Sequence, residues 1–140
     1  MSAVKAVWLP GWVPESGVQL CEAGVDFDAV RVEGRAGGEV VAVLRRLTAD
    51  APGPVLSEYG GRWFYFLVAP RTAQRLSWPK WVSLCVAREG ETTYVGVPAP
   101  SGATGSLQWL TPPTPERPYV CAYLLERVVK ETGHEAADLP

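Results

Sequence analysis

The spacing of apolar side chains changes several times along the chain, and each change marks a predicted strand or helix. Residues 27–33 (FDAVRVE) alternate between apolar and polar side chains, which predicts a half-buried strand. In residues 37–50 the apolar positions recur at the spacing of one helix face, and Pro52 ends this predicted helix. A second apolar stripe after Pro118 predicts a C-terminal helix that ends at Gly133.

Two apolar runs on either side of Gly60 and Gly61 predict a β-hairpin. Residues 54–59 (PVLSEY) and 62–68 (RWFYFLV) are rich in the aromatic and aliphatic side chains that strands favour. Both glycines can adopt a positive φ, which a tight turn between antiparallel strands requires. We expect the aromatic residues of the second run to fill both faces of a central strand.

Other segments complete an α+β fold. Weaker patterns predict further strands at residues 4–9, 81–87, 92–97 and 107–110. Gly90 is expected to supply a turn between the second and third of these, and residues 69–78 to form a short helical turn or loop. The result is a mostly antiparallel sheet of about six to seven strands, with one early helix and one C-terminal helix on one sheet face. Strands and helices do not alternate regularly, which argues against a doubly wound fold.

Length and composition predict one globular domain. The chain has 140 residues, of which 47% are hydrophobic and 20% charged, and its 14 glycines and 13 prolines favour short strands and many turns. We expect a single domain over residues 1–133 and a frayed tail over residues 134–140. The N-terminal apolar run is cut by Pro10 and is too short for a signal peptide or a membrane span. A cytoplasmic protein without a membrane partner is therefore predicted.

The cysteines and the histidine restrict the chemistry that is expected. Cys21, Cys85 and Cys121 are far apart and odd in number, and His134 is the single histidine, which argues against a disulfide framework or a zinc site. Cys85 and Cys121 occupy apolar positions and are expected to be small buried hydrophobes, whereas His134 is expected at the surface. The sequence contains no motif of a serine hydrolase, a zinc protease or a phosphate-binding loop. We predict no catalytic residue, no metal site and no cofactor.

Basic residues gather in the middle of the chain, although the net charge is −2. Residues 59–88 hold five basic and no acidic side chains, whereas residues 1–58 hold five against eight and residues 89–140 three against seven. Arginine and lysine beside exposed tryptophan can grip phosphates and stack bases. The predicted nucleic-acid-binding residues are Arg62, Arg71, Arg75, Trp78, Lys80, Trp81 and Arg88. The alternative is that the two tryptophans pack over a sheet edge and the basic side chains are simply solvated.

The tryptophans also favour a protein interface. A domain of this size usually buries fewer than the set formed by Trp8, Trp12, Trp78, Trp81 and Trp109. Tryptophan and tyrosine anchor protein interfaces, so an exposed patch of them would mark a homodimer or a partner-binding surface. Ionic strength separates the two hypotheses, because nucleic-acid binding weakens steeply as salt rises and an aromatic interface does not.

The middle of the chain carries motifs that resemble a known enzyme domain. Residues 54–73 contain Gly60-Gly61, Tyr65-Phe66 and Val68-Ala69-Pro70, and residues 78–113 contain Gly90, the run YVGVPAPS and Trp109. Together they resemble the second half of the primase–polymerase (prim-pol) domain of bacterial and plasmid replication proteins. The chain is also similar to small actinobacterial proteins that are rich in tryptophan and proline. The resemblance implies a prim-pol-like fold.

Several positions depart from the prim-pol pattern. A prim-pol site needs carboxylates that hold divalent metal and a histidine or basic group on the phosphates. Trp63 stands at the histidine position, and residues 84–86 lack the acidic ligand. Asp26 and Asp28 alternate and form one metal-like pair, but two acids that begin a strand are more often a turn and a solvated face.

The resemblance and its departures imply a truncated, catalytically degenerate prim-pol module that acts by binding. The leading hypothesis is a nucleic-acid-associated or replication-linked accessory protein that binds DNA or RNA with residues 62–88. The first alternative is a protein-interaction module or homodimer that uses exposed tryptophan and tyrosine. The second is a metal-dependent nucleotidyl transferase that uses Asp26 and Asp28.

Overall fold

The computed structural model describes residues 9–100 and 105–137, with side chains up to Thr132. Its strands form two antiparallel sheets, which confirms the predicted α+β class. The larger sheet has the strand order β5-β2-β4-β3-β7, and the smaller one pairs β1 with β6. The elements are β1 Val18–Glu22, β2 Asp28–Glu33, α1 Gly34–Leu47, β3 Val55–Glu58, β4 Trp63–Val68, the 3₁₀ helix η1 Ala73–Arg75, β5 Ser83–Cys85, β6 Tyr94–Pro98, β7 Leu107–Thr111 and α2 Ala122–Ala137.

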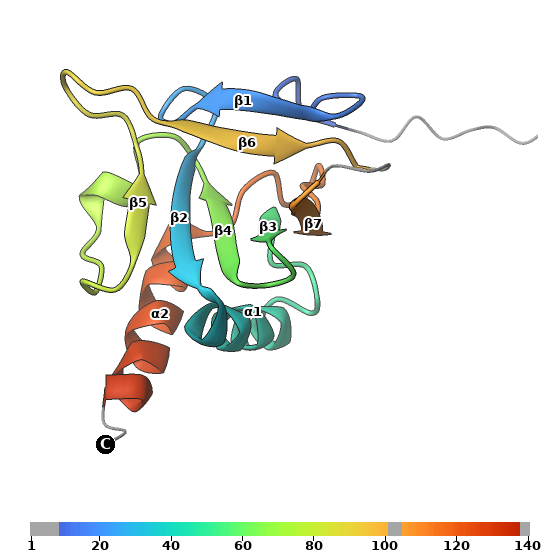
Figure 1. Cartoon of the computed structure of the whole chain (residues 1–140). Coiled ribbons are helices and arrows are strands. Elements are labelled where there is room, and N and C mark those ends of the chain that lie inside the picture. The colour runs from blue at the N-terminus through green and yellow to red at the C-terminus, as the bar shows by residue number, and fades with distance from the viewer. Residues whose placement is uncertain (1–8, 101–104, 138–140) are drawn as a thin grey trace, which may run out of the picture.

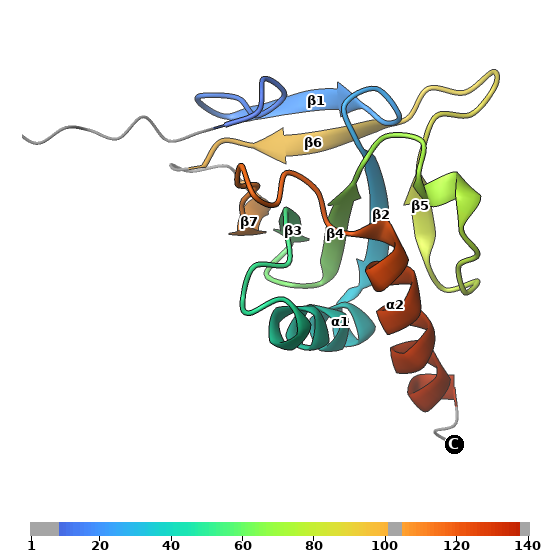
Figure 2. The same cartoon turned by 180° about the vertical axis from the view of Figure 1, so that it is seen from behind.

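Both helices pack on one face of the five-stranded sheet, as predicted (Figures 1 and 2). Val32 of β2 and Phe66 of β4 meet Leu44 of α1 and Leu125 of α2 in this layer, and all four side chains are fully buried. Strand alternation makes this layer possible, because every second side chain of β2 and β4 points to the same face. The remaining side chains of these strands point to the opposite face.

The two-stranded sheet covers one end of that opposite face. Val97 of β6 and the indole of Trp12 pack there with Leu67 of β4, and the ring centres of Trp12 and Phe27 lie 5.0 Å apart. These residues form a second core, separate from the one beneath the helices. Toward the end of β2 and the start of β4, Arg31 and Trp63 are not part of this second core, whereas Tyr65 packs against its edge.

The predicted hairpin joins β3 to β4. Gly60 has a φ of +65° and Gly61 a φ of +95°, in the backbone region that favours glycine. The two strands pair antiparallel from end to end, which confirms the prediction. Helix α1 begins beside this turn, earlier than predicted, because the N–H of Gly34 donates to the carbonyl oxygen of Arg62 at 2.7 Å.

The strands on either side of Gly90 belong to different sheets. Gly90 does form the turn, with a φ of +77°, but β5 pairs with β2 and β6 pairs with β1. Between β5 and β6, the described chain forms one isolated antiparallel bridge, which joins Arg88 to Glu91. Each strand buries apolar side chains in a different core: Val86, next to β5, beneath the helices, and Val97 of β6 beside Trp12.

The sequence pattern gives little signal for β1. Val18 and Leu20 are exposed, whereas Cys21 is buried, so apolar side chains point to both sides of the strand. An alternation of apolar and polar residues is therefore lost. Its antiparallel pairing with β6 positions this strand.

Helix α2 begins later and ends later than predicted. Val120 first pairs with β4, and its N–H donates to the carbonyl oxygen of Leu67 at 2.8 Å, so the helix starts at Ala122. The helix passes through Gly133, where it was expected to end, and continues to Ala137. A glycine inside a helix costs only about 1 kcal/mol relative to alanine, which the rest of the helix can offset.

Some predictions fall on residues that the structure does not describe. The strand expected at residues 4–9 lies almost wholly within residues 1–8, and residues 138–140 of the expected tail are also outside the described ranges. Residues 134–137 of that tail belong to α2. Within the described ranges, no helix has the length and apolar character that crossing a membrane requires.

Candidate functional site

The five basic residues predicted to bind nucleic acid are all exposed, but they lie at two ends of the larger sheet. Strands β4 and β5 run in the same direction, because both pair antiparallel with β2. Arg62 and Lys80 precede these strands, whereas Arg71 and Arg88 follow them. Arg75 belongs to η1, which contacts the start of β2. Arg75 therefore lies at the same end of the sheet as Arg71. A six-residue strand is about 20 Å long, so the five charges do not gather in one place.

The two tryptophans of the segment RLSWPKW have different surroundings. Trp78 packs against the core beneath the helices, and its indole N–H donates to the carbonyl oxygen of Ala73 at 2.8 Å. Trp81 is 39% exposed. Trp78 therefore has a structural role at the sheet edge, as the alternative prediction expected, whereas Trp81 remains available to a partner.

Trp12 and Trp109 do not build an exposed patch. Trp12 is buried in the second core, and the indole N–H of Trp109 donates to the carbonyl oxygen of Pro98 at 2.8 Å. Trp8 lies outside the described residues. The expected surface of exposed tryptophans is therefore not formed by Trp12 and Trp109.

Arg31 lies on β2, an inner strand of the larger sheet, on the face opposite the helices. The strand register places it opposite Tyr65 in β4 and Ser83 in β5. Its guanidinium carbon lies 3.7 Å from the centre of the Trp63 ring and 5.8 Å from that of Tyr65, which is a cation–π arrangement. No described carboxylate forms an ion pair with Arg31, and its buried Nε has no hydrogen-bond partner in the described chain. Aromatic rings therefore take the place of an acid beside this cation.

Tyr65 is held firmly on the same face. Its hydroxyl donates to Oε1 of Glu58 at 3.0 Å, from the neighbouring strand β3. Burial and this hydrogen bond raise the pKa of Tyr65 to about 12, although the charge of Arg31 opposes the shift. The phenol is therefore protonated at neutral pH and holds one carboxylate oxygen of Glu58.

We call Arg31, Trp63 and Tyr65 the open-face cluster. Arg31 and Trp63 lie toward the end of β2 and the start of β4, away from the two-stranded sheet (Figure 1), and Tyr65 packs against the edge of the second core. Arg62 and Lys80 lie at the same end of the sheet. The structure thus brings two of the predicted cations to the end where Arg31 and two aromatic side chains lie.

The sequence analysis did not single out the open-face cluster as a site. Alternation already puts Trp63 and Tyr65 on one face of their strand and Arg31 on one face of its own. The pattern does not show that β2 and β4 are neighbours, nor that their register places Arg31 on the same face of the sheet as Trp63 and Tyr65. If β2 and β4 had been assumed to pair in this register, the sequence alone would have identified the cluster.

The aspartate pair does not share a strand face. Asp28 is fully buried, and its Oδ2 accepts the N–H of Ala73 at 3.2 Å, whereas its Oδ1 has no partner in the described chain. Asp26 is exposed, and its backbone carbonyl accepts the Tyr119 hydroxyl at 2.7 Å. The expected solvated face is therefore wrong for Asp28. Among the described residues, no group of three or more histidine, cysteine, aspartate or glutamate side chains is arranged to hold a metal.

The cysteines differ in exposure. Cys21 is buried and Cys85 half-buried, and burial raises the pKa of both thiols, so they are protonated at neutral pH. Cys121 is exposed, which corrects the prediction of a buried hydrophobe, because it precedes α2 and is not on its apolar stripe. The side chain of His134 lies outside the described residues.

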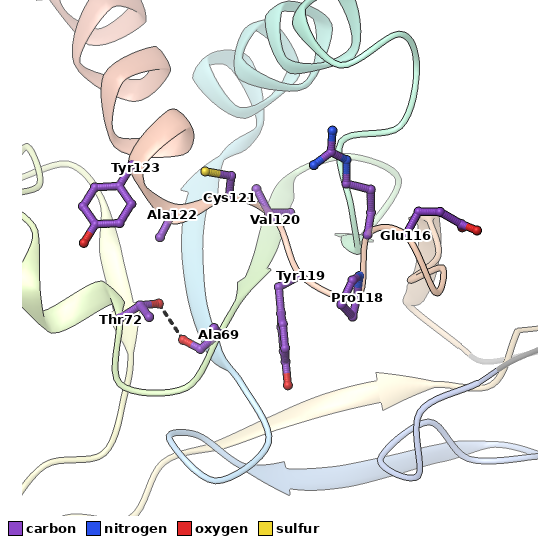
Figure 3. Close-up of a pocket in the computed structure, with 10 residues that line it drawn as sticks. Ala69, Thr72, Glu116, Pro118, Tyr119, Val120, Cys121, Ala122 and Tyr123 are labelled. Atoms are coloured by element: carbon purple, nitrogen blue, oxygen red, sulfur yellow. Dashed lines mark hydrogen bonds between the residues drawn. The ribbon is translucent and has the colours of Figure 1, made fainter.

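A pocket of about 310 Å³ lies at the other end of β4 (Figure 3). Its walls come from the loop after β4 and from the segment that leads into α2. The Thr72 hydroxyl donates to the carbonyl oxygen of Ala69 at 2.6 Å and closes the loop. A neighbouring pocket of about 180 Å³ shares Arg117, Val120 and Cys121 with it.

Comparisons with protein-family models, with curated proteins and with solved structures gave no match. The prim-pol resemblance therefore rests on the short motifs between residues 54 and 113 and stays a prediction.

Proposed function

We propose that this chain binds single-stranded nucleic acid through the open-face cluster. The observation that carries the proposal is the stack of Arg31 on Trp63, with a guanidinium that has no carboxylate partner in the described chain. A structural arginine in the middle of a sheet is normally paired with an acid or a carbonyl, because leaving its donors unmet costs free energy. The Nε of Arg31 is buried, so a ligand that accepts hydrogen bonds would meet the guanidinium through its terminal nitrogens.

Bases and phosphates are the ligand groups that suit this surface. Single-stranded nucleic acid is recognised by bases that stack on aromatic side chains and on the plane of arginine guanidinium groups. RNA-recognition motifs use aromatic side chains on the open face of a four-stranded sheet in this way. Trp63, Tyr65 and the guanidinium of Arg31 offer such planes, and Arg62 and Lys80 are exposed at the same end for the backbone phosphates.

The charge at this surface predicts a moderate salt dependence. Arg31, Arg62 and Lys80 are its cations, Glu58 is engaged by Tyr65, and Glu33 is exposed beside Trp63. About two phosphate contacts, from Arg62 and Lys80, would give a slope of about −1.4 for the logarithm of affinity against the logarithm of salt concentration. Such binding is consistent with the cytoplasmic, replication-linked role that the sequence analysis expects.

The proposal predicts that Arg31→Gln weakens binding to a fluorescently labelled thymidine octamer. Loss of one stacking plane should cost about 1–3 kcal/mol, which is about fivefold to 150-fold in affinity. Fluorescence anisotropy at low salt measures this loss, and circular dichroism checks that the variant folds. Arg45→Gln is the matched control, because Arg45 is exposed on α1 and pairs with Asp50. The proposal fails if the unmodified protein does not bind, or if both variants bind equally well.

A protein interface is the second candidate, and the two-stranded sheet favours it. Leu20 of β1 is 69% exposed and Tyr94 of β6 is 59% exposed, with Val18 nearby on β1. In the described chain β1 and β6 pair only with each other, so each leaves one edge open to another strand. A homodimer or a partner strand would cover these side chains.

This second candidate predicts that Leu20→Arg disrupts self-association. An arginine at this apolar position would be buried in the interface without a partner, which is costly. Sedimentation equilibrium at micromolar concentration should show a dimer for the unmodified protein and a monomer for the variant, at low and at high salt alike. A monomer in both cases would exclude the homodimer.

A further inference from the structure

Tyr59 has a strained backbone conformation at the tip of the β3–β4 hairpin. Its φ is +53°, in the left-handed region that glycine favours and bulky side chains rarely adopt. Its N–H donates to the carbonyl oxygen of Ser106 at 2.9 Å, and the N–H of Arg62 donates to that of Glu58 at 3.0 Å, so the turn is held on both sides. Glycine would suit this position better. The turn therefore does not explain why residue 59 is a tyrosine.

The side chain of Tyr59 does not support the fold either. It is 65% exposed, and its ring belongs to neither core. Among the described residues its hydroxyl has no hydrogen-bond partner, and the ring stacks on no other aromatic side chain. Strained backbone conformations occur mostly where a residue contacts a ligand or takes part in function. A strained tyrosine with an unsupported ring is therefore a candidate for ligand contact.

Tyr59 lies directly beyond the open-face cluster. Glu58 and Trp63 form the last pair of the β3–β4 ladder, and Tyr59 follows Glu58 in the chain. Glu58 lies on the face of the cluster, because its Oε1 accepts the Tyr65 hydroxyl. Consecutive Cα atoms are about 3.8 Å apart and paired ones about 5 Å, so the Cα atoms of Tyr59 and Trp63 lie within about 10 Å. A nucleic-acid strand bound at the cluster is long enough to reach Tyr59.

We infer that Tyr59 is a further base-stacking residue for the single strand that the open-face cluster is proposed to bind. The inference rests on that proposed function. One base of the strand stacks on the Tyr59 ring, beyond the bases that meet the cluster. Every base has a π-face, so this contact adds affinity without a sequence preference. The affinity gained from the ring offsets the strain that the tyrosine brings to the turn.

Tyr59→Gly separates a role in binding from a role in stability. Glycine relieves the strain, so the thermal midpoint should stay the same or rise by up to about 4 °C. Loss of the ring should weaken binding to the labelled thymidine octamer at low salt by about fivefold or more, as measured by fluorescence anisotropy. Tyr59→Phe restores the ring and should restore the affinity.

Ala49→Gly is the matched control. Ala49 has nearly the same φ, +52°, but it follows the end of α1, whereas the hairpin lies beside the start of that helix. A helix of 14 residues is about 21 Å long, so the control relieves a similar strain far from the cluster and should leave the affinity unchanged.

The outcomes distinguish the inference from the proposed function. If the unmodified protein does not bind the octamer, the proposed function fails and the inference fails with it. If the unmodified protein binds and Tyr59→Gly binds equally well, the inference alone is wrong. A lower thermal midpoint for Tyr59→Gly would also overturn the inference, because the ring would then support the fold, and so would an equal loss of affinity in Ala49→Gly.

Discussion

Asp28 places a carboxylate in a fully buried position at the start of β2. One oxygen holds the loop after β4 through the N–H of Ala73, and the other has no partner in the described chain. Burial raises the pKa of Asp28, and the loop amides and the charge of Arg71 only partly oppose this shift. The residue therefore positions the loop, and burial makes its ionisation less favourable in the folded protein than in the unfolded chain.

The stability of the protein should therefore depend on pH through Asp28. The folded pKa is raised above the ordinary 3.8, so the folded state holds the proton more tightly than the unfolded chain does. This contribution to the free energy of unfolding is fully present below pH 3.8 and is lost as pH rises through the raised folded pKa. Asp28→Asn keeps an acceptor oxygen but cannot titrate. Urea denaturation from about pH 3.5 to pH 7 should show the unmodified protein losing stability relative to the variant, and parallel profiles would contradict the assignment.

At the scale of elements, the junction of β2, α1 and the hairpin explains why glycine stands at residue 34. The N–H of Gly34 donates to the carbonyl of Arg62, which draws the start of α1 against the turn. A Cβ added at Gly34 would overlap the carbonyl oxygen of Gly61 and lie 3.0 Å from that of Arg62. Both obstacles are backbone atoms, which cannot rotate away.

Gly34→Ala should therefore destabilise the fold, although alanine is the better helix former. We expect a loss of about 1–3 kcal/mol in the free energy of unfolding, as for other overpacked sites. Gly38→Ala is the matched control on the same helix, because nothing lies within 4 Å of its added Cβ, and it should stabilise by up to about 1 kcal/mol. Thermal and urea denaturation measure both changes, and equal effects of the two substitutions would contradict this account of the junction.

Elements fixed by neighbouring residues could be predicted from the sequence, and those fixed by distant partners could not. The Gly60-Gly61 hairpin and the amphipathic pattern of α1 are local signals, and the structure confirms both. The sheet that accepts β6 depends on β1 and Trp12, far away in sequence. The open-face cluster needs the register of β2 against β4, which alternation alone does not specify.

The charge distribution shows the same limit at the scale of the whole molecule. The excess of basic residues over 59–88 is real in the sequence, but parallel directions of β4 and β5 divide it between two ends of the sheet. One end, with Arg62 and Lys80, also holds the stacked Arg31 and Trp63. The net charge of −2 makes a long-range attraction for nucleic acid weak, so the proposed binding depends on a local surface.

The most direct test is an NMR titration of the full chain with a thymidine octamer at low salt, with the shifts mapped on the fold. Binding through the open-face cluster predicts the largest shifts at the amides of Arg31, Arg62 and Tyr65 and at the indole N–H of Trp63. Shifts centred on Arg71, or no saturable shift at any described residue, would contradict it.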